Sequence, residues 1–391
     1  MILTKRVRLK PTPEQLMLFN KSAGAARRAY NYVLDEKERV YQEYLNNDKQ
    51  GTRTITVGEI RKNITKLKHS THLWLNEVGV NVVKRAAINA DDAYKKFFKG
   101  QADKPHKKSK YRDSLSFYVN YETLSKDNEG FRGEKIGFVK TAEPLPDIPS
   151  DKKYSNPYIS FDGKYWYLTV GYEVPEKEVS HTGEIVGIDL GVENLATCSN
   201  GKVYENINKT IKVKKLKKKL KREQRKLSRM IGSNISSYNK NRKPIYIKPL
   251  SECKNIQKQK KVIKLIYRTL ANIRNNYMHQ VTTEIVKSLP SRVVMENLNV
   301  NGMMKNKYLA EAIAEQQFYQ FNKTMKYKCE LYGIIFVEAD RFYASSKICS
   351  HCGHKKNDLQ LSDRTYVCPH CGYIINRDLN ASVNLAKYQT K

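Results

Sequence analysis

The stretch Ile185-Val-Gly-Ile-Asp-Leu-Gly-Val (residues 185–192) decides the fold of this chain. Its apolar run ends at an acid, Asp189, which is the pattern of a buried strand. A second strand pattern, Leu195–Ser199, follows at hairpin distance, and the later run Val293-Val-Met also ends at an acid, Glu296. Acids that end apolar strands stand out in so basic a chain and indicate a candidate functional site.

A third acid, Asp378, lies in Asn376-Arg-Asp-Leu-Asn-Ala-Ser-Val-Asn, just before a predicted last helix at Asn380–Tyr388. A buried carboxylate is costly unless it is paired or binds a metal, and three together would repel one another and a phosphate. Two Mg²⁺ ions resolve both conflicts, because they can bind the carboxylates and clamp a scissile phosphodiester. The alternative is that Asp189 and Asp378 are only turn or cap residues. Alone, the acids favour a metal-dependent nuclease or transposase.

Four of the seven cysteines form two C-x-x-C knuckles that are fifteen residues apart. Each knuckle is followed by a glycine, which allows a tight turn around a metal. The spacing is typical of a zinc site, and four thiolates fill a tetrahedral shell, so we expect one structural Zn²⁺. His351, His354 and His370 lie nearby as surface groups outside that shell. The predicted ligands are Cys349, Cys352, Cys368 and Cys371.

The charge balance of the chain predicts a polyanionic partner. The 391 residues contain 72 Lys+Arg and 39 Asp+Glu, which gives a formal net charge of +33, far more than solubility requires. The strongest concentration is Lys209–Arg229, where Glu223 is the single acid. No apolar stretch approaches the length of a membrane span, and a charged residue, Lys5, already occurs within the first five residues, so we expect neither a membrane nor a secreted protein.

The remaining patterns alternate between helical and extended segments. Residues 2–9 predict a strand, and Thr12 and Pro13 predict the start of a long helix. Short strand patterns between 115 and 178 predict a small β unit, which could close into a barrel with the first strand as a partner. Other segments are predicted as follows: helices at Val57–Lys68, Leu75–Phe98, residues 255–288 and Leu309–Leu331; a basic loop at Lys99–Arg112; a loop at residues 232–250; and strands at Arg292–Glu296 and Ile334–Ala339.

An ordered set of motifs resembles the TnpB (OrfB-type) proteins of insertion sequences, relatives of the type V CRISPR effector nucleases. The motifs are Gly187-Ile-Asp-Leu-Gly-Val-Glu-Asn-Leu-Ala-Thr, Met295-Glu-Asn-Leu, Ser345-Ser-Lys-Ile-Cys-Ser-His-Cys-Gly and the pair Cys368-Pro-His-Cys-Gly with Asn376-Arg-Asp-Leu-Asn. Looser matches, such as Asp92-Ala-Tyr-Lys-Lys-Phe-Phe, extend the resemblance over essentially the whole chain.

The resemblance implies an α+β multidomain protein. It implies a helical recognition domain at 11–114 and a wedge domain, a β-barrel, at 1–10 and 115–180. It also implies an RNase H-like (RuvC) α/β nuclease domain at 181–348 and 373–391, with a zinc-binding insert at 349–372.

The same resemblance implies an RNA-guided DNA endonuclease with Asp189, Glu296 and Asp378 as its catalytic, Mg²⁺-binding acids. The expected partners are one transposon-end-derived guide RNA per protein and a double-stranded DNA target, with the protein itself reading only a short transposon-adjacent motif. The expected setting is the prokaryotic cytoplasm, at the nucleoid. Side chains expected on the nucleic-acid backbone are Lys214, Lys217, Lys218, Lys221, Arg222, Arg225 and Arg377.

The predicted motif-reading residues are Asn81, Lys84 and Arg85. The resemblance implies glutamines at the latter two positions. Arginine and lysine favour guanine, whereas glutamine favours adenine, so our hypothesis is a motif that contains a G. Contact with phosphate alone is the alternative. Phe342 and Tyr343 are candidates for base stacking or for core packing.

Two other functions are compatible with these residues. RNase H-like acids also serve transposases that carry out strand transfer, and DNA cleavage that depends on a co-purified RNA would separate the two. A guided repressor without cleavage would be expected to have lost one of the three acids, and all are present here.

Overall fold

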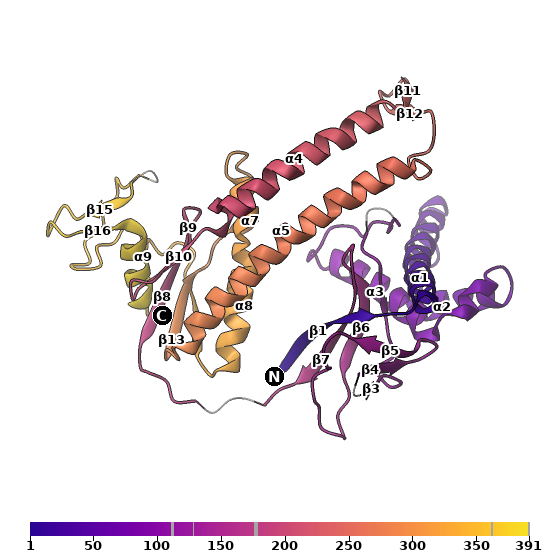
Figure 1. The fold of residues 1–391 in the computed structure, drawn as a ribbon, viewed down its shortest axis with the longest axis horizontal. Helices are drawn as coiled ribbons and strands as arrows, with labels where there is room; N and C mark the ends of the chain where they lie inside the picture. The colour runs from indigo at the N-terminus through magenta and orange to yellow at the C-terminus, as the bar shows by residue number, and fades with distance from the viewer. Residues whose placement is uncertain (111–112, 128, 176–178, 361–362, 390–391) are drawn as a thin grey trace. The chain divides into compact units, whose positions relative to one another are not determined.

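The computed structural model describes residues 1–110, 113–127, 129–175, 179–360 and 363–389. The chain divides into two compact units, Met1–Val174 and Pro175–Lys391, each with its own apolar core (Figure 1). The predicted α+β multidomain class is confirmed at this level. None of the described helices is long and apolar enough to cross a membrane.

Strand β1 (Ile2–Lys10) lies near the middle of the seven-stranded sheet of the first unit, whose order is β2-β6-β7-β1-β5-β4-β3. It pairs antiparallel with β7 through Arg8 and then with β5 at Leu9 and Lys10. No pairing between the edge strands β2 and β3 is among the described ones, so the predicted barrel is seen as an open sheet. The other strands are β2 (Ser116–Tyr118), β3 (Ser125–Asp127), β4 (Gly130–Gly133), β5 (Gly137–Thr141), β6 (Ser155–Phe161) and β7 (Trp166–Glu173).

The long helix α1 (Pro13–Asn46) begins where the sequence predicts it. The Thr12 side chain accepts a hydrogen bond from the Gln15 backbone, and the Gln15 side chain returns one to Thr12, so the first turn is capped. Phe19 packs against Trp166 of the sheet at 5.2 Å between ring centroids. The predicted helix Leu75–Phe98 is interrupted, and its segment consists of η1 (Leu73–Glu77) and α3 (Val80–Phe98); α2 is Val57–His69.

The second unit is built on a five-stranded sheet of order β10-β9-β8-β13-β14. Strands β8, β9 and β10 form an antiparallel meander, whereas β13 and β14 run parallel to β8. Val293 and Met295 face the core that includes residues of α5 and α8, and Val294 faces α9. A strand covered on both faces reads as an unbroken apolar run. The strands are β8 (Ile185–Leu190), β9 (Asn194–Cys198), β10 (Val203–Glu205), β13 (Arg292–Glu296) and β14 (Ile335–Ala339).

Two sequence predictions in this unit are wrong. The helix predicted at Leu309–Leu331 is broken at Gln317, whose φ of +56° is left-handed and ends the first piece. The loop predicted at 232–250 contains a hairpin, because the Asn239 side chain accepts hydrogen bonds from the backbone of Asn241 and Lys243 and closes a turn. The helices and remaining strands are η2 (Ile207–Lys209), α4 (Ile211–Gly232), β11 (Ile235–Tyr238), β12 (Pro244–Tyr246), α5 (Lys254–Lys287), α6 (Val300–Met303), α7 (Ala310–Gln316), α8 (Phe318–Leu331), β15 (Thr365–Val367), β16 (Ile374–Asn376) and α9 (Arg377–Ala386).

Candidate active site and metal centres

Two of the three predicted acids lie side by side at one edge of the five-stranded sheet. Asp189 is on β8 and Glu296 is the last residue of β13. The two strands run parallel with Met295 opposite Ile188, so the next residue along each strand is an acid. Parallel strands end at the same edge of a sheet, and both carboxylates therefore reach one place.

The third acid arrives through a close helix–strand contact. Helix α9 packs on β8 at Gly187, where a Cβ atom would lie 2.0 Å from the Ser382 carbonyl oxygen and 2.4 Å from the Ala386 nitrogen. Only glycine allows this approach. The contact brings Asp378, in the first turn of α9, near enough to Asp189 for the two charges to interact.

The structure excludes the cap and turn alternatives for these acids. Asn376, not Asp378, caps α9, because its side chain accepts hydrogen bonds from the backbone N–H groups of Asp378 (3.0 Å) and Leu379 (3.1 Å). Asp189 lies within β8 rather than in the turn that follows it. Neither position is explained by local backbone needs.

The electrostatics of the site favour a bound cation. Burial raises the pKa of Asp189 well above its usual range, the charges of Glu296 and Asp378 raise it further, and Arg377 opposes them. Burial also raises the pKa of Glu296, although a hydrogen bond from the Ser345 hydroxyl acts in the opposite direction. The donor atoms are carboxylate oxygens, which are the ligands that Mg²⁺ prefers. The residues present therefore fit a magnesium site.

Arg377 lies beside these acids, as the sequence predicts. Its guanidinium is 3.3 Å from an Asp378 carboxylate oxygen, and both side chains are largely buried. Arginine at this place neutralises part of the acidic charge, and its Nε and Nη2 groups donate to the Asp378 carboxylate.

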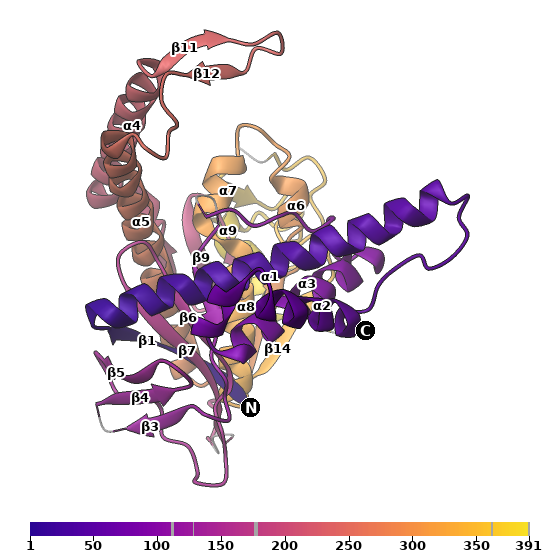
Figure 2. The same ribbon diagram turned by 90° about the vertical axis from the view of Figure 1, so that its right-hand side faces the viewer.

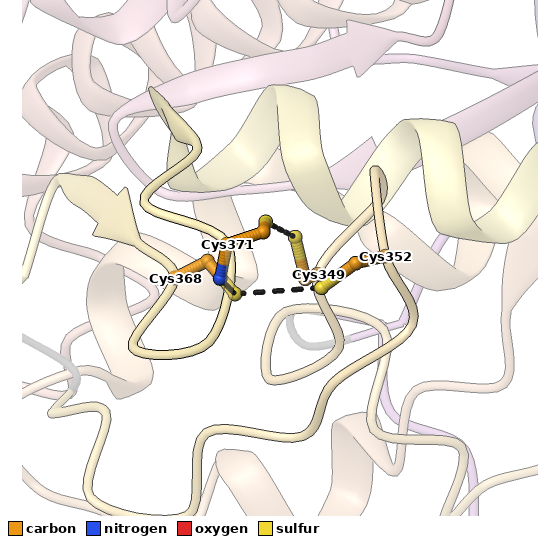
Figure 3. A group of neighbouring side chains, drawn as sticks. All are labelled: Cys349, Cys352, Cys368 and Cys371. Atoms are coloured by element: carbon orange, nitrogen blue, oxygen red, sulfur yellow. Dashed lines mark hydrogen bonds between the residues drawn. The ribbon is translucent and has the colours of Figure 1, made fainter.

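The four predicted zinc ligands converge (Figure 3). Their sulfur atoms all lie within 4.8 Å of one another, with 3.8 Å between Cys349 and Cys371 and 3.6 Å between Cys352 and Cys368. A tetrahedron with zinc–sulfur bonds of about 2.3 Å has edges of about 3.8 Å. The geometry therefore fits one zinc ion with a closed shell of four thiolates.

The turns around the cysteines have the form that the glycines predict. Gly353 and Gly372 have φ values of +77° and +72°, and their N–H groups donate to the carbonyls of Cys349 and Cys368. The nearby histidines lie outside the sulfur cluster, and the rings of His354 and His370 stack with centroids 5.5 Å apart.

Hydrogen bonds connect the zinc knuckles to α9. The buried Asn380 side chain donates to the Ile348 carbonyl at 2.7 Å and accepts from the Ser350 N–H at 2.9 Å. Asn384 donates to the carbonyls of Ile348 (2.6 Å) and Ser345 (2.7 Å). Since α9 carries Asp378 and Ser345 contacts Glu296, the knuckles brace both of these acids.

The predicted backbone-binding cations lie along α4. Lys214, Lys218, Lys221 and Arg225 are exposed. Among the described residues, ion pairs of α4 are restricted to Lys217, which pairs with Glu315 at 2.8 Å, and Arg222, which pairs with its neighbour Glu223.

The predicted motif-reading residues differ in exposure along α3. Lys84 is exposed. Asn81 is half-buried and donates to Glu134 at 3.4 Å. The Arg85 guanidinium donates to the Asn156 side chain at 3.5 Å and lies over the Tyr118 ring. Lys84 is thus the most accessible of the three.

Comparison with known families gives three matches in chain order. A "Helix-turn-helix domain" of OrfB (IS605) proteins matches residues 1–46, the OrfB (IS605) "Probable transposase" matches 169–307, and a "Cas12f1-like, TNB domain" matches 318–385. The ranges together span more than half of the chain. The chain belongs to the TnpB (OrfB-type) family. In this member, the range matched as helix-turn-helix is β1 and the single helix α1, which ends at Asn46.

Relatives of this TnpB-family chain match over nearly its full length. An Escherichia coli K12 protein named "Putative RNA-guided DNA endonuclease InsQ" is 26% identical and the match covers 97% of this chain and 90% of the relative. A Streptomyces pristinaespiralis "Putative RNA-guided DNA endonuclease" is also 26% identical, over 97% and 87%. The fold resembles Cas12f1 in a cryo-EM structure of a Cas12f1–sgRNA–target DNA complex, with a TM-score of 0.55, 13% identity and coverage of 99% and 98%.

A cleft in this TnpB-family chain opens beside the acids and was missed by the sequence patterns. It has a volume of about 620 Å³, and Glu296 lines it together with Tyr319 and Arg341. The Met295-Glu-Asn-Leu motif was the available signal, because Asn297, Asn299 and Asn301 continue from it along the cleft wall.

The two aromatic candidates near this site have different environments. Phe342 is 90% exposed. Tyr343 packs against Tyr388 with ring centroids 4.9 Å apart, and its hydroxyl donates to the Asn384 carbonyl. Core packing is therefore the role of Tyr343, and Phe342 is available for contact with another molecule.

Proposed function

We propose that this chain is an RNA-guided DNA endonuclease with one RuvC-like catalytic centre at Asp189, Glu296 and Asp378. The observation that carries the proposal is the convergence of these acids from β8, β13 and α9, with the pKa of Asp189 raised by burial and by its two acidic neighbours. The relatives named as RNA-guided DNA endonucleases support the same activity.

In the proposed mechanism each residue has a distinct task. Two Mg²⁺ ions, when bound, would supply Lewis-acid activation of water and stabilise the leaving oxygen. The charges of both other acids act on Asp189. Its carboxylate would therefore help to hold both ions. Ser345 holds the Glu296 carboxylate in place through its hydroxyl. Arg377 would orient the scissile phosphate with its N–H donors.

The cleft beside Glu296 is the proposed path of the DNA strand toward the acids. Its amide side chains can donate to phosphate and base edges, and Arg341 adds a positive charge. Single strands would be cut in turn, because the described structure holds one such acidic centre.

The predicted domains take their roles within this proposal. The 1–10 and 115–180 wedge and the 11–114 recognition domain would contact the DNA and the guide RNA–DNA heteroduplex, and 181–348 with 373–391 would be the RNase H-like nuclease domain. One Zn²⁺ in the 349–372 insert would brace α9. The basic side chains of α4 would follow nucleic-acid phosphates. One protein per RNA, acting at a prokaryotic nucleoid, completes the proposal.

The proposed adjacent motif contains a G, read by Lys84 with Asn81 and Arg85 beside it. Lysine can donate to guanine O6 and N7 in the major groove. Motif-depletion sequencing of cleaved plasmid libraries tests this, and a motif made only of A and T positions would contradict it. The basic loop predicted at Lys99–Arg112 would instead hold the guide RNA and its heteroduplex with DNA, and it lies partly outside the described residues, since 111 and 112 are not described.

The decisive experiment uses Asp189→Ala in the complex with its co-purified RNA. We expect loss of DNA cleavage with guide-dependent DNA binding retained, since the acid contacts the reacting phosphate rather than the guide. Glu330→Ala, at an exposed acid outside the site, is the matched control and should cleave normally. Cleavage by Asp189→Ala would refute the assignment, and RNA-independent strand joining by the wild type would favour the transposase alternative.

A further inference from the structure

Helices α4 and α5 form an antiparallel arm with the β11–β12 hairpin at its far end (Figures 1 and 2). An apolar seam that includes Leu220 and Ile266 holds the two helices together. The arm begins close to the acids, because Asn206, just before it, donates to the Val192 carbonyl that follows β8. Its base is fixed to α7 through Glu315.

The arm carries a disproportionate share of the positive charge of the chain. Residues 211–274 contain 22 lysines and arginines and two acids, Glu223 and Glu252. The Glu223 side chain is already engaged by Gln259 and Arg222. From 224 to 251, which includes the whole hairpin, there is no acid at all.

The hairpin has a defined backbone rather than a loose one. At its base, the Asn234 side chain donates to the Lys248 carbonyl at 2.7 Å and accepts from the Lys248 N–H at 3.2 Å. At its turn, the Asn239 N–H donates to the Lys243 carbonyl, and Arg242 takes a left-handed φ of +55°. The turn therefore presents Lys240, Arg242 and Lys243 in a fixed arrangement.

One face of the hairpin is aromatic. Tyr238 lies opposite Pro244, and directly opposed residues of antiparallel strands project to the same side. Tyr246, two positions beyond Pro244, shares that side. Tyr238 is 63% exposed, and no carboxylate of the described residues pairs with the three basic side chains of the turn. An exposed aromatic flanked by unpaired cations is the composition of a nucleic-acid stacking surface.

We propose that the β11–β12 hairpin binds an unpaired segment of the guide RNA, with a base stacked on Tyr238 and phosphates contacted by Lys240, Arg242 and Lys243. This rests on the proposed RNA-guided function. The 22 residues of α4 span about 33 Å, so the hairpin is well beyond one duplex diameter from the end of the arm near the acids. The nucleic acid at the tip is therefore the RNA and not the strand being cut.

The test measures binding of the full chain to the RNA that co-purifies with it, across a range of KCl concentrations and without DNA. We expect Tyr238→Ala to weaken binding by roughly five- to a hundredfold and Tyr238→Phe to leave it nearly unchanged, because the ring supplies the stacking. The triple variant Lys240→Ala, Arg242→Ala and Lys243→Ala should flatten the dependence of log K on log salt by about two to three units.

The matched control removes the same charge elsewhere: Lys305→Ala, Lys307→Ala and Lys326→Ala, all exposed. This control variant should keep the wild-type dependence of log K on log salt. In an RNase footprint it should protect the same nucleotides at the tip of the arm as the wild type. Circular dichroism confirms that each variant is folded, which we expect because the apolar seam of the arm is untouched.

Three results would overturn the proposal. The first is wild-type RNA affinity and footprint in both Tyr238→Ala and the triple variant. The second, in a parallel titration of the RNA-loaded protein with target DNA, is weaker DNA binding by the variants with unchanged RNA binding, which would place DNA at the tip. The third is a difference in oligomeric mass between the RNA-free variants and the RNA-free wild type, which would make the hairpin a contact with a second copy. If the wild type itself binds no RNA, the proposed function fails, and that outcome is distinct from the first three.

Discussion

The fold holds the carboxylate of Asp189 in an unfavourable electrostatic environment. Its neighbours Glu296 and Asp378 raise its pKa, so at neutral pH the site either retains a proton or stores repulsion that a cation would relieve. The same arrangement that would make the site bind Mg²⁺ makes it costly when empty. This consequence can be measured without any nucleic acid.

Asp189→Asn should raise the stability of the protein when no Mg²⁺ is present. The folded-state pKa of Asp189 lies above its unfolded value, so wild-type stability is highest at acidic pH and falls as pH rises through the folded pKa. Asparagine removes this loss, and we expect a gain of about 1–3 kcal/mol at pH 7.5 in Mg²⁺-free buffer. Thermal unfolding from pH 5 to 8 is the measurement.

Two further readings sharpen that experiment. Added Mg²⁺ should stabilise the wild type and leave Asp189→Asn nearly unaffected. Equal unfolding temperatures for both proteins at every pH in Mg²⁺-free buffer would show that the acids do not repel one another.

Lys328 is a second ionisable residue in an unfavourable environment, and it is a base rather than an acid. It is buried on α8, and its ammonium donates to the His279 carbonyl and the hydroxyls of Thr282 and Thr283 at 2.7–2.8 Å. Burial lowers its pKa to about 8. These hydrogen bonds offset part of the cost of burying a charge.

The lowered pKa of Lys328 predicts that the free energy of unfolding rises with pH. The variant Lys328→Met should not show this rise. Between pH 8 and about 10.5 the unfolded chain holds more protons at this position than the folded chain, so unfolding becomes harder as pH rises. Below pH 8 both states are protonated and the effect is flat. From pH 7.5 to 9.5 the wild type should gain about 2 kcal/mol relative to Lys328→Met in urea unfolding. Parallel pH profiles for the two proteins would contradict the assignment.

At the scale of elements, the close contact of α9 with β8 places the third acid. Gly187→Ala would put a methyl group within 2.0 Å of the Ser382 carbonyl. Backbone cannot yield as a flexible side chain does, so we expect a loss of about 3 kcal/mol in stability and a drop in cleavage as Asp378 moves away. Gly232→Ala is the matched control, because nothing lies within 4 Å of its added methyl, and it should change stability by less than about 0.5 kcal/mol. Similar results for both variants would mean that α9 adjusts freely.

The strands of the five-stranded sheet were predicted from the sequence more accurately than the hairpin within 232–250 and the helix break at Gln317. The apolar runs placed β13 correctly and β8 within a residue, because a strand covered on both faces leaves an uninterrupted apolar run. The hairpin was missed because Ser, Asn and Pro dominate 232–250, and its turn depends on the side-chain hydrogen bonds of Asn239. The break at Gln317 was missed because glutamine is not a helix-breaking residue type.

The candidate site could be predicted as a set of residues but not as an arrangement. Acids at strand ends and the spacing of the cysteines are local patterns. The support that Ser345 gives to Glu296, and the hydrogen bonds from Asn384 to the carbonyls of Ser345 and Ile348, join residues 36 or more positions apart. No periodicity in the chain records such contacts.

For the whole molecule, the separate cores of the two units predict separate unfolding. The apolar cluster of the first unit lies entirely within Met1–Val174, and the larger cluster of the second lies within Pro175–Lys391. Calorimetry should resolve two transitions. Removal of zinc with a chelator, or Cys352→Ser, should lower the transition of the second unit only, because the knuckles brace α9 within it. A single transition that shifts as a whole would contradict this.

The first and last residues of the first unit meet: the amino group of Met1 donates to the Val174 carbonyl at 3.2 Å, where β1 lies against β7. A ribosome must therefore complete β7 before the central strand of that sheet has its main partner, so the unit closes late in its own synthesis. Adjacent ends also make the unit suitable for circular permutation. In the first unit by itself, joining 174 to 1 and opening the chain at an exposed turn, such as Asn47–Lys49, should preserve the sheet and move the start of the unit to a new place.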